Sequence, residues 1–391
     1  MSVTKISSDN ILSMSSAKLT GAMPAMDGSA LTGIVAGSEA MTGSSDPVNE
    51  TNPADGVGAL WINTTNGEMF ICVDATTNGN VWNNVGEGTG HITYTPPLPF
   101  GGLGGGTVSG YTVGGNVGAA DIEVFSIPSD TGSTYVGNLT IGRNSHAGHS
   151  STTHGYISGG AVPPFQTNIE RFAFASPSSS ADWSDLQVAV NAPIGSMNQT
   201  HGYTCGGTPN YPTPSNYIDK FSFSSQATAS SHGVLARSVF WCGSMASYTD
   251  IYVAGSWTNL SGSNGVDKFA FASNTTATTV YSLASNKSHP AGYSNSTDGY
   301  IAGGHNGSAS TGTIDKISFA SDTITNGHGN LNTARQSAGS VSSTTAGYVA
   351  AGSGLNGVMN NREKYTFSNE SISSGLGGIT QAKHSPTGNQ Y

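Results

Sequence analysis

The stretch Gly299-Tyr300-Ile301-Ala302-Gly303-Gly304 decides the fold, because close relatives of it recur along the chain. An apolar run ends here in a Gly-Gly pair that favours a turn. A second run with alternating apolar and polar residues, Ile314-Asp315-Lys316-Ile317-Ser318-Phe319, begins about ten residues later. This pattern predicts two neighbouring β-strands that are joined by a loop.

The opening occurs six times, and each copy carries a tyrosine at the same place. These tyrosines are Tyr111, Tyr156, Tyr203, Tyr252, Tyr300 and Tyr348, so that successive copies are 45, 47, 49, 48 and 48 residues apart. Internal repeats of this length are typical of a propeller or a solenoid.

The second run repeats as faithfully as the opening. In the copy Ile169-Glu170-Arg171-Phe172-Ala173-Phe174, the two aromatic residues are two positions apart and therefore share one face of a strand. We expect this face to be buried against the neighbouring repeat, as it would be in a propeller.

The composition limits the possible functions. Of 391 residues only 9% are charged, 54 are Gly, and the formal net charge is −10. Because the chain has no basic stripe, we expect no role in binding nucleic acid. It has no apolar span of about 18 residues and no secretory signal pattern at its start, so we expect neither membrane insertion nor secretion.

The N-terminal quarter differs from the repeats. Residues 1–45 are small and apolar without a clean period, and we interpret them as an extended docking arm that other chains order. Residues 46–93 read as a small β module with a hairpin turn at Asn66-Gly67 and a core of Trp61, Phe70 and Trp82. Three short strands are marginal alone, so the module is expected to pack on a partner.

Two resemblances follow from these residues. The six Gly-Gly copies resemble Kelch-type β-propeller repeats, which implies an all-β fold with a six-bladed propeller over residues 94–391. No Trp recurs at a fixed place in the copies, which departs from the best-known Kelch pattern. The 18–33 stretch and the 58–68 stretch resemble the arms of bacteriophage tail-fibre and tail-associated virion proteins of marine or cyanobacterial phages.

The charged residues follow the repeat. One acid accompanies each second run, and these acids are Glu123, Glu170, Asp219, Asp267, Asp315 and Glu363. Five cations lie on the same runs (Arg171, Lys220, Lys268, Lys316 and Lys364), and five precede an opening or its equivalent (Arg143, Arg237, Lys287, Arg335 and Lys383). The pattern fits either a ring of charges that binds a ligand or repeated ion pairs between blades, which partly buried charges require.

Lys383 indicates how the repeats close. It lies 48 residues after Arg335, yet no opening follows it before the chain ends at Tyr391. The first opening, at Gly110, has no cation before it at the same distance. We therefore expect the last residues to supply the first strand of the first blade, which removes the exposed sheet edges.

Catalytic patterns are poor. His146, His149 and His154 could suggest zinc, but their spacings do not fit one strand face, so a surface or inter-blade role is preferred. The three cysteines, Cys72, Cys205 and Cys242, are far apart in sequence and are expected to be buried free thiols. We expect no catalytic residues, no metal and no cofactor, and hence no enzyme, although paired carboxylates for glycoside hydrolysis remain an open alternative.

The loops between the two recurring strands vary in length and carry the candidate ligand-binding residues. These are Phe165, Tyr211, Tyr217 and Trp257. Variable loops on a rigid scaffold usually carry recognition. Aromatic rings among Asn, Ser and Thr suit sugars, although the same rings could simply pack the loops.

The sequence therefore predicts a virion protein, a tail fibre or tail appendage that displays a propeller for attachment to a host-surface glycan. Its expected partners are other tail or capsid proteins, bound through the arm, and copies of itself in a trimer or ring. The main alternative is a purely structural tail, neck or capsid-decorating protein without receptor contact. A glycan-processing enzyme is the third alternative.

Overall fold

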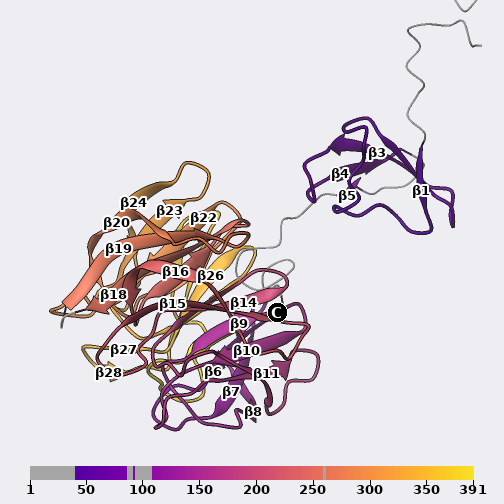
Figure 1. Cartoon of the computed structure of the whole chain (residues 1–391). Helices are drawn as coiled ribbons and strands as arrows, with labels where there is room; N and C mark the ends of the chain where they lie inside the picture. Colours follow the sequence, from indigo (N-terminus) through magenta and orange to yellow (C-terminus); the bar gives the residue numbers. More distant parts are fainter. Residues whose placement is uncertain (1–39, 86–90, 93–107, 259–260) are drawn as a thin grey trace, which may run out of the picture. The chain divides into compact units, whose positions relative to one another are not determined.

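The computed structural model describes residues 40–85, 91–92, 108–258 and 261–391, and every regular element in them is a β-strand (Figure 1). The chain divides into two compact units, Met1–Tyr94 and Thr95–Tyr391. Within the described ranges, no helix is long and apolar enough to cross a membrane.

The first unit contains one five-stranded sheet in chain order. Its strands are β1 (Met41–Gly43), β2 (Leu60–Asn63), β3 (Met69–Asp74), β4 (Val81–Asn84) and β5 (His91–Ile92). Strands β2 and β3 form the predicted hairpin, and Gly67 in its turn has a φ of 78°. The Trp61 and Trp82 rings meet edge to face at 6.4 Å, and Phe70 and Trp82 are buried as predicted.

The start of this sheet lies earlier in the chain than the sequence predicted. Met41–Gly43 falls in the predicted arm, but it pairs in parallel with β2, and Met41 packs against the core of the sheet. The arm boundary at residue 45 is therefore wrong by several residues. The rest of the arm, residues 1–39, lies outside the described residues.

The second unit contains six four-stranded sheets in which sequential neighbours run antiparallel. The first strands are β9 (Ala147–Ser150), β13 (Ile194–Met197), β17 (Gly243–Ala246), β21 (Ala291–Ser294), β25 (Gly339–Ser342) and β31 (Thr387–Gln390). The second strands carry the openings and are β10 (His154–Ser158), β14 (His201–Cys205), β18 (Asp250–Thr258), β22 (Asp298–Ala302), β26 (Ala346–Ala350) and β6 (Ser109–Val113).

The outer two strands complete each sheet. The third strands are β11 (Asn168–Ala173), β15 (Ser215–Ser222), β19 (Ser261–Ala270), β23 (Thr313–Ser318), β29 (Arg362–Thr366) and β7 (Asp121–Ser126). The fourth strands are β12 (Ala181–Asp185), β16 (Ser230–Val239), β20 (Thr278–Lys287), β24 (Thr323–Asn330), β30 (Ser371–Ser373) and β8 (Thr134–Asn138). A short hairpin of β27 (Ser353–Gly354) and β28 (Gly357–Val358) lies in one of the loops.

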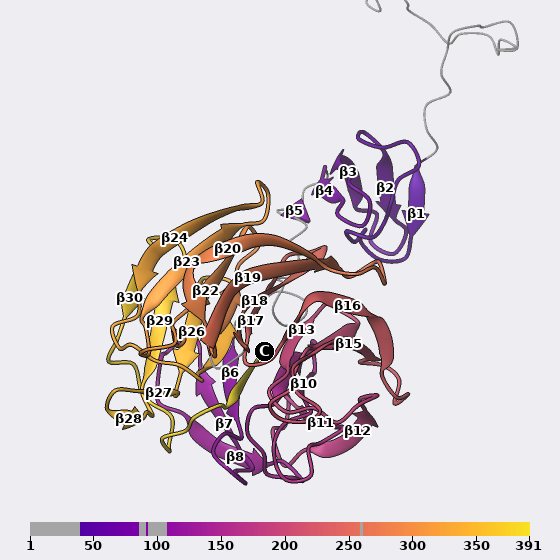
Figure 2. The ribbon, with the colours of Figure 1, turned by 60° about the vertical axis from the view of Figure 1, so that its left-hand side comes forward.

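The six sheets follow one another around a centre (Figure 2). Their first strands form a closed circuit of contacts, from β9 through β13, β17, β21, β25 and β31 back to β9. The C-terminal strand β31 pairs with β6, from Thr387 opposite Val113 to Gln390 opposite Gly110. This pairing agrees with the expectation from Lys383. The arrangement is consistent with a β-propeller-like fold.

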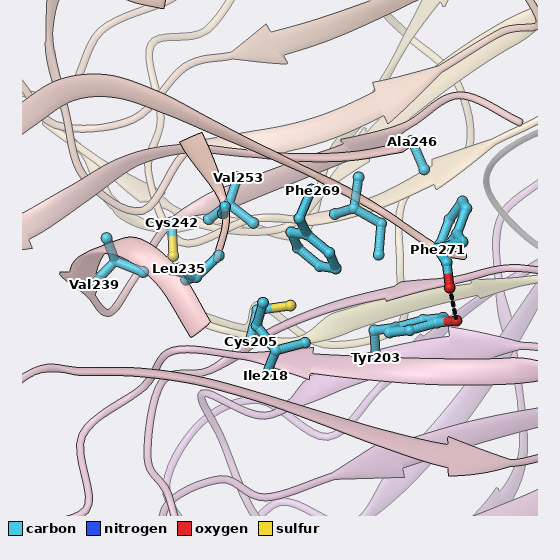
Figure 3. Close-up of a cluster of buried hydrophobic side chains, with 12 residues drawn as sticks. Tyr203, Cys205, Ile218, Leu235, Val239, Cys242, Ala246, Val253, Phe269 and Phe271 are labelled. Atoms are coloured by element: carbon cyan, nitrogen blue, oxygen red, sulfur yellow. Dashed lines mark hydrogen bonds between the residues drawn. The ribbon is translucent and has the colours of Figure 1, made fainter. Parts of the chain in front are cut away.

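The recurring aromatic residues join each sheet to the next. All six opening tyrosines are almost completely buried. Tyr156 stacks on Phe223 of the sheet that follows, with ring centres 4.7 Å apart. Tyr252 stacks in the same way on Phe319 of the sheet after its own, with ring centres 5.2 Å apart. Tyr203 likewise donates a hydrogen bond to the carbonyl of Phe271, within a cluster that also contains two cysteines (Figure 3). The predicted burial of the aromatic face against the neighbouring repeat is confirmed.

Around the centre the first strands approach so closely that small residues are required. A Cβ added at Gly292 on β21 would lie 2.0 Å from the carbonyl oxygen of Ser244, and one at Gly388 on β31 would lie 1.9 Å from that of Ser340. At two of the six equivalent places serine occurs instead, and Ser340 donates a hydrogen bond of 2.7 Å to the Gly292 carbonyl. Adjacent sheets are thus held at a fixed small spacing.

We predict that Gly292→Ala lowers the free energy of unfolding by about 2–3 kcal/mol, because the added methyl group forces two first strands apart. Ser340→Ala is the matched control and should lose about 1 kcal/mol, the net contribution of one hydrogen bond. Denaturant unfolding of both variants measures the difference. Equal losses would mean that the spacing of the first strands is not fixed.

We also predict that deletion of Gln381–Tyr391 removes a large share of the total stability, which for a folded domain is about 5–15 kcal/mol. The deletion exposes the edge of β6 and removes Lys383 from its buried carboxylate partner Glu123. Thermal unfolding followed by circular dichroism tests this. An unchanged melting curve would contradict a closing role for the C-terminal strand.

Candidate functional site

A buried acid on the third strand of each sheet anchors the connection that arrives from the preceding sheet. The carboxylate of Glu170 on β11 pairs with Arg143 and accepts a hydrogen bond of 2.7 Å from the backbone N–H of Thr140. Both charged side chains are inaccessible to solvent. Burial alone would raise the pKa of Glu170, but the Ser180 hydroxyl and the Arg143 charge bring it below its ordinary value.

Three other sheets repeat this arrangement with the pairs Lys287–Asp315 at 3.1 Å, Arg335–Glu363 at 2.5 Å and Lys383–Glu123 at 2.7 Å. In a fourth sheet, Asp267 pairs at 2.9 Å with Arg237, which lies two residues before the equivalent place, and that place is held by Val239. In all five pairs the acid is at most 1% exposed, so it cannot reach a ligand. Of the two sequence alternatives, repeated ion pairs are therefore correct for these residues, and a ligand-binding ring of these acids is wrong.

Asp219 on β15 is the exception. It is 7% exposed, accepts a hydrogen bond of 2.9 Å from the backbone N–H of Gln187, and forms no ion pair with any described residue. The place occupied by Arg143 and Lys287 in other sheets is held here by Val190. Burial accordingly raises the pKa of Asp219, because no cation compensates the buried charge.

Two residues beyond the position of Arg143, each connection contributes one residue to a closed ring of backbone hydrogen bonds. We call these six residues the mouth ring; they are Ser145, Ala192, Trp241, His289, Ser337 and Ser385. The N–H of each one donates to the carbonyl of the ring residue in the preceding sheet, over 2.7–3.1 Å, and Ser145 closes the circle by donating to Ser385. All six have left-handed φ angles of 49–56°, although none is glycine.

Left-handed backbone costs a non-glycine residue roughly 1–2 kcal/mol. Six such residues at equivalent places show that the closed hydrogen-bond ring imposes this conformation. The mouth ring surrounds a central pocket with a volume of about 90 Å³, lined by residues of all six first strands and their connections, among them Trp241 and His289.

On one side of the mouth ring, six aromatic side chains form a continuous cluster. We call this the aromatic cluster; it consists of Tyr211, Phe240, Trp241, Trp257, His289 and His305. Trp241 and His289, both in the mouth ring, stack with ring centres 4.3 Å apart. Tyr211 meets Trp241 edge to face at 6.1 Å, and Trp257 meets His289 and His305 at 6.1 Å each.

The cluster combines apolar rings with a neutral imidazole. Burial and the neighbouring His305 and His384 lower the pKa of His289 to about 3, so its ring is uncharged at neutral pH. Tyr211 has 57% of its surface exposed, whereas Trp241, Trp257 and His289 are half-buried. The faces and edges of these rings can therefore pack against a flat apolar surface without any change of charge.

The structure brings together two of the four predicted residues. Tyr211 and Trp257 belong to the aromatic cluster. Phe165 is half-buried, and Tyr217 on β15 has 46% of its surface exposed; neither forms a ring contact with the cluster. Sequence reasoning missed Trp241 and His289, because it searched only the loops between second and third strands. For His289 the signal was its position two residues after the connection cation Lys287, whereas Trp241 lies four residues after Arg237 and had no such signal.

Of the residues that could suggest chemistry, His149 and the three cysteines are buried within the packed sheets. His149 bridges two sheets, through a 2.9 Å contact with the Ser196 carbonyl and another with the Ser158 hydroxyl. Among the described residues, no group of three or more His, Cys, Asp or Glu could hold a metal ion. The three cysteines are buried free thiols, as predicted, and burial raises the pKa of Cys242 to about 12.

Comparison with known proteins bears on the fold. No protein-family profile matches the chain, and no curated protein matches it in sequence. The chain is similar in structure to YjhT, with a TM-score of 0.59 over 71% of this chain and 97% of that one, at 10% identity. At this identity the likeness concerns the fold alone.

We predict that Asp219→Asn stabilises the protein at neutral pH. Because the pKa of Asp219 is higher in the folded than in the unfolded protein, the charged carboxylate lowers the stability of the wild type at neutral pH. This cost disappears as the pH falls through the folded-state pKa and then the unfolded-state pKa. The advantage of the variant should therefore be largest at pH 7 and vanish near pH 3. Urea unfolding across this pH range measures it.

The control is Glu170→Gln at the equivalent place in the neighbouring sheet. It should cost about 3–5 kcal/mol at neutral pH, because it leaves the buried Arg143 without its partner. If Asp219→Asn instead destabilises the protein at pH 7, the unpaired carboxylate contributes favourably and the interpretation is wrong.

Proposed function

We propose that the repeat unit is a six-bladed β-propeller, closed by its C-terminal strand, that serves as a carbohydrate-binding module. The closed circuit of first strands, the β31–β6 pairing and the likeness to the YjhT fold support the architecture. The observation that carries the binding function is the aromatic cluster at the mouth ring, where rings from three consecutive blades meet.

Sugars fit this surface better than charged ligands do. A pyranose offers an apolar face to a stacked ring, and its hydroxyl groups can bond with neutral side chains and backbone. The nearby charges are engaged in buried pairs such as Lys287–Asp315, so they contribute little attraction at the surface. We therefore propose binding without chemistry, because the third-strand acids are committed to structure.

We further propose that the protein is a virion component, a tail fibre or tail appendage on a bacteriophage particle. This rests on the resemblance of residues 18–33 and 58–68 to phage arm sequences. In this proposal the arm and small sheet attach the chain to other tail or capsid proteins and to copies of itself, in a trimer or ring. The propeller would then contact a host-surface glycan.

The second candidate is a structural tail, neck or capsid-decorating protein. The large exposed area of Tyr211 supports it equally, because a neighbouring subunit could cover the aromatic cluster. The two functions differ in whether the cluster is open to solvent on the particle. Locating the protein on particles by cryo-electron microscopy would show this directly.

We predict that the multivalent full chain binds glycans on an array, and that Trp257→Ala with Tyr211→Ala reduces the signal by about tenfold or more. Each lost ring contact contributes roughly 1 kcal/mol, and many copies multiply the effect by avidity. Tyr135→Ala is the matched control, because Tyr135 is 56% exposed but lies in β8, outside the cluster. Equal signals from all proteins, or none from any, would favour the structural candidate.

A further inference from the structure

Three sheets show how a lysine on the third strand is neutralised at the far end of the sheet from the mouth ring. Lys268, Lys316 and Lys364 each pair with an acid in the turn between the third and fourth strands of the next sheet. The pairs are Lys268–Asp322 at 3.0 Å, Lys316–Glu370 at 2.8 Å and Lys364–Asp130 at 2.7 Å. A second acid at the start of the lysine's own second strand assists in two cases, Asp250 at 3.7 Å and Asp298 at 3.8 Å.

Lys220 on β15 occupies the same position without either acid. The sheet after that of Lys220 carries Phe271-Ala272-Ser273-Asn274 in the turn between its third and fourth strands. The equivalent turn that pairs with Lys268 is Phe319-Ala320-Ser321-Asp322, so Asn274 replaces the acid Asp322. The place of Asp250 and Asp298 is held by His201, the first residue of β14. No described residue forms an ion pair with Lys220.

The other third-strand cations that lack an acid in the described part of the chain are covered by aromatic rings. The Arg171 guanidinium lies 3.7 Å from the centre of the Trp183 ring. Arg362 lies 4.0 Å from the Phe125 ring and donates a hydrogen bond of 2.9 Å to the Thr131 carbonyl. The ammonium of Lys220 is 5.8 Å from the Tyr203 ring centre, a distance typical of its acid-paired equivalents.

Lys220 instead borders a pocket with a volume of about 270 Å³. Hydroxyl and amide groups line this pocket beside the lysine, and they come from Ser222, Thr228, Ser230, Ser231 and Asn274. His201 also lines it. Burial lowers the pKa of His201, and the neighbouring charge of Lys220 lowers it further.

We propose that this pocket binds a small oxyanion, namely a sulfate, a phosphate or the carboxylate of an acidic sugar. A half-buried lysine among hydroxyl donors provides the charge-assisted hydrogen bonds that such anions require. The anion takes the place of the carboxylate that Asp322, Glu370 and Asp130 supply in the sister sheets. The pocket lies at the opposite end of the sheet from the aromatic cluster, so the proposal does not depend on glycan binding there.

Equilibrium dialysis of the full chain with radiolabelled sulfate, at constant ionic strength, tests the site. We expect about one bound sulfate per chain in the wild type. Lys220→Gln should weaken binding at least about tenfold, the usual cost of a lost hydrogen bond to a charged group. Asn274→Asp should abolish binding as well, because the new carboxylate pairs with Lys220 as in the sister sheets.

Lys316→Gln is the matched control and should bind sulfate like the wild type, because Lys316 is already paired with Glu370. Thermal unfolding in sulfate against chloride gives a second readout. Sulfate stabilises proteins generally by exclusion from their surfaces. Only the amount by which sulfate raises the melting temperature of the wild type more than that of Asn274→Asp therefore reports binding at the site. This difference also remains informative if Lys220→Gln folds poorly.

Competition identifies the natural class of anion. Labelled sulfate is displaced with four unlabelled competitors: phosphate, glucuronate, a sulfated monosaccharide and neutral glucose. The strongest competitor identifies the class of anion. Equal binding by the wild type, Lys220→Gln and Asn274→Asp would overturn the proposal. So would the absence of binding to the wild type with every anion, or competition by neutral glucose as strong as that by the anions.

Discussion

The repeat unit depends on one buried contact, the carboxylate on the third strand that holds the incoming connection. Glu363 accepts hydrogen bonds from the backbone N–H groups of Asn332 and Thr333, at 2.6 and 3.0 Å, and pairs with Arg335. A buried carboxylate is costly unless such partners compensate it. The compensation therefore fixes the connection against the sheet, directly before the residues that form the mouth.

The mouth ring lies two residues beyond this anchor. Two residues after Arg335, Ser337 has a left-handed backbone and donates its N–H to the His289 carbonyl, which continues the circle. The first strands lie so close that a Cβ at Gly292 or Gly388 would clash with a carbonyl of the neighbouring strand. The aromatic rings of Trp241 and His289 thus stand where the rigid backbone places them, which limits the entropy that binding would cost.

Much of this architecture could be predicted from the sequence, because it rests on residues that every copy repeats. The Gly-Tyr openings, the alternating aromatic runs and the phase of Lys383 led to the strands, the burial of their aromatic face and the β31–β6 pairing. The joining of β1 to the small sheet could not be predicted, since three residues carry no periodic signal. Nor could the aromatic cluster, which depends on a backbone conformation that brings connections and loops together.

Residues that differ from the repeat are more informative about function than residues that every copy shares. A residue present in every copy is explained by the packing of the sheets, as the anchoring acids show. Asp219 and Lys220 are consecutive on β15, face opposite sides of the strand, and each lacks the partner that its equivalents have. The rings of the aromatic cluster come from this sheet, from the one that follows it and from the connection and loop just beyond. The unpaired charges and the aromatic rings therefore fall in neighbouring sheets, which is why both proposed binding sites are assigned to this part of the circle.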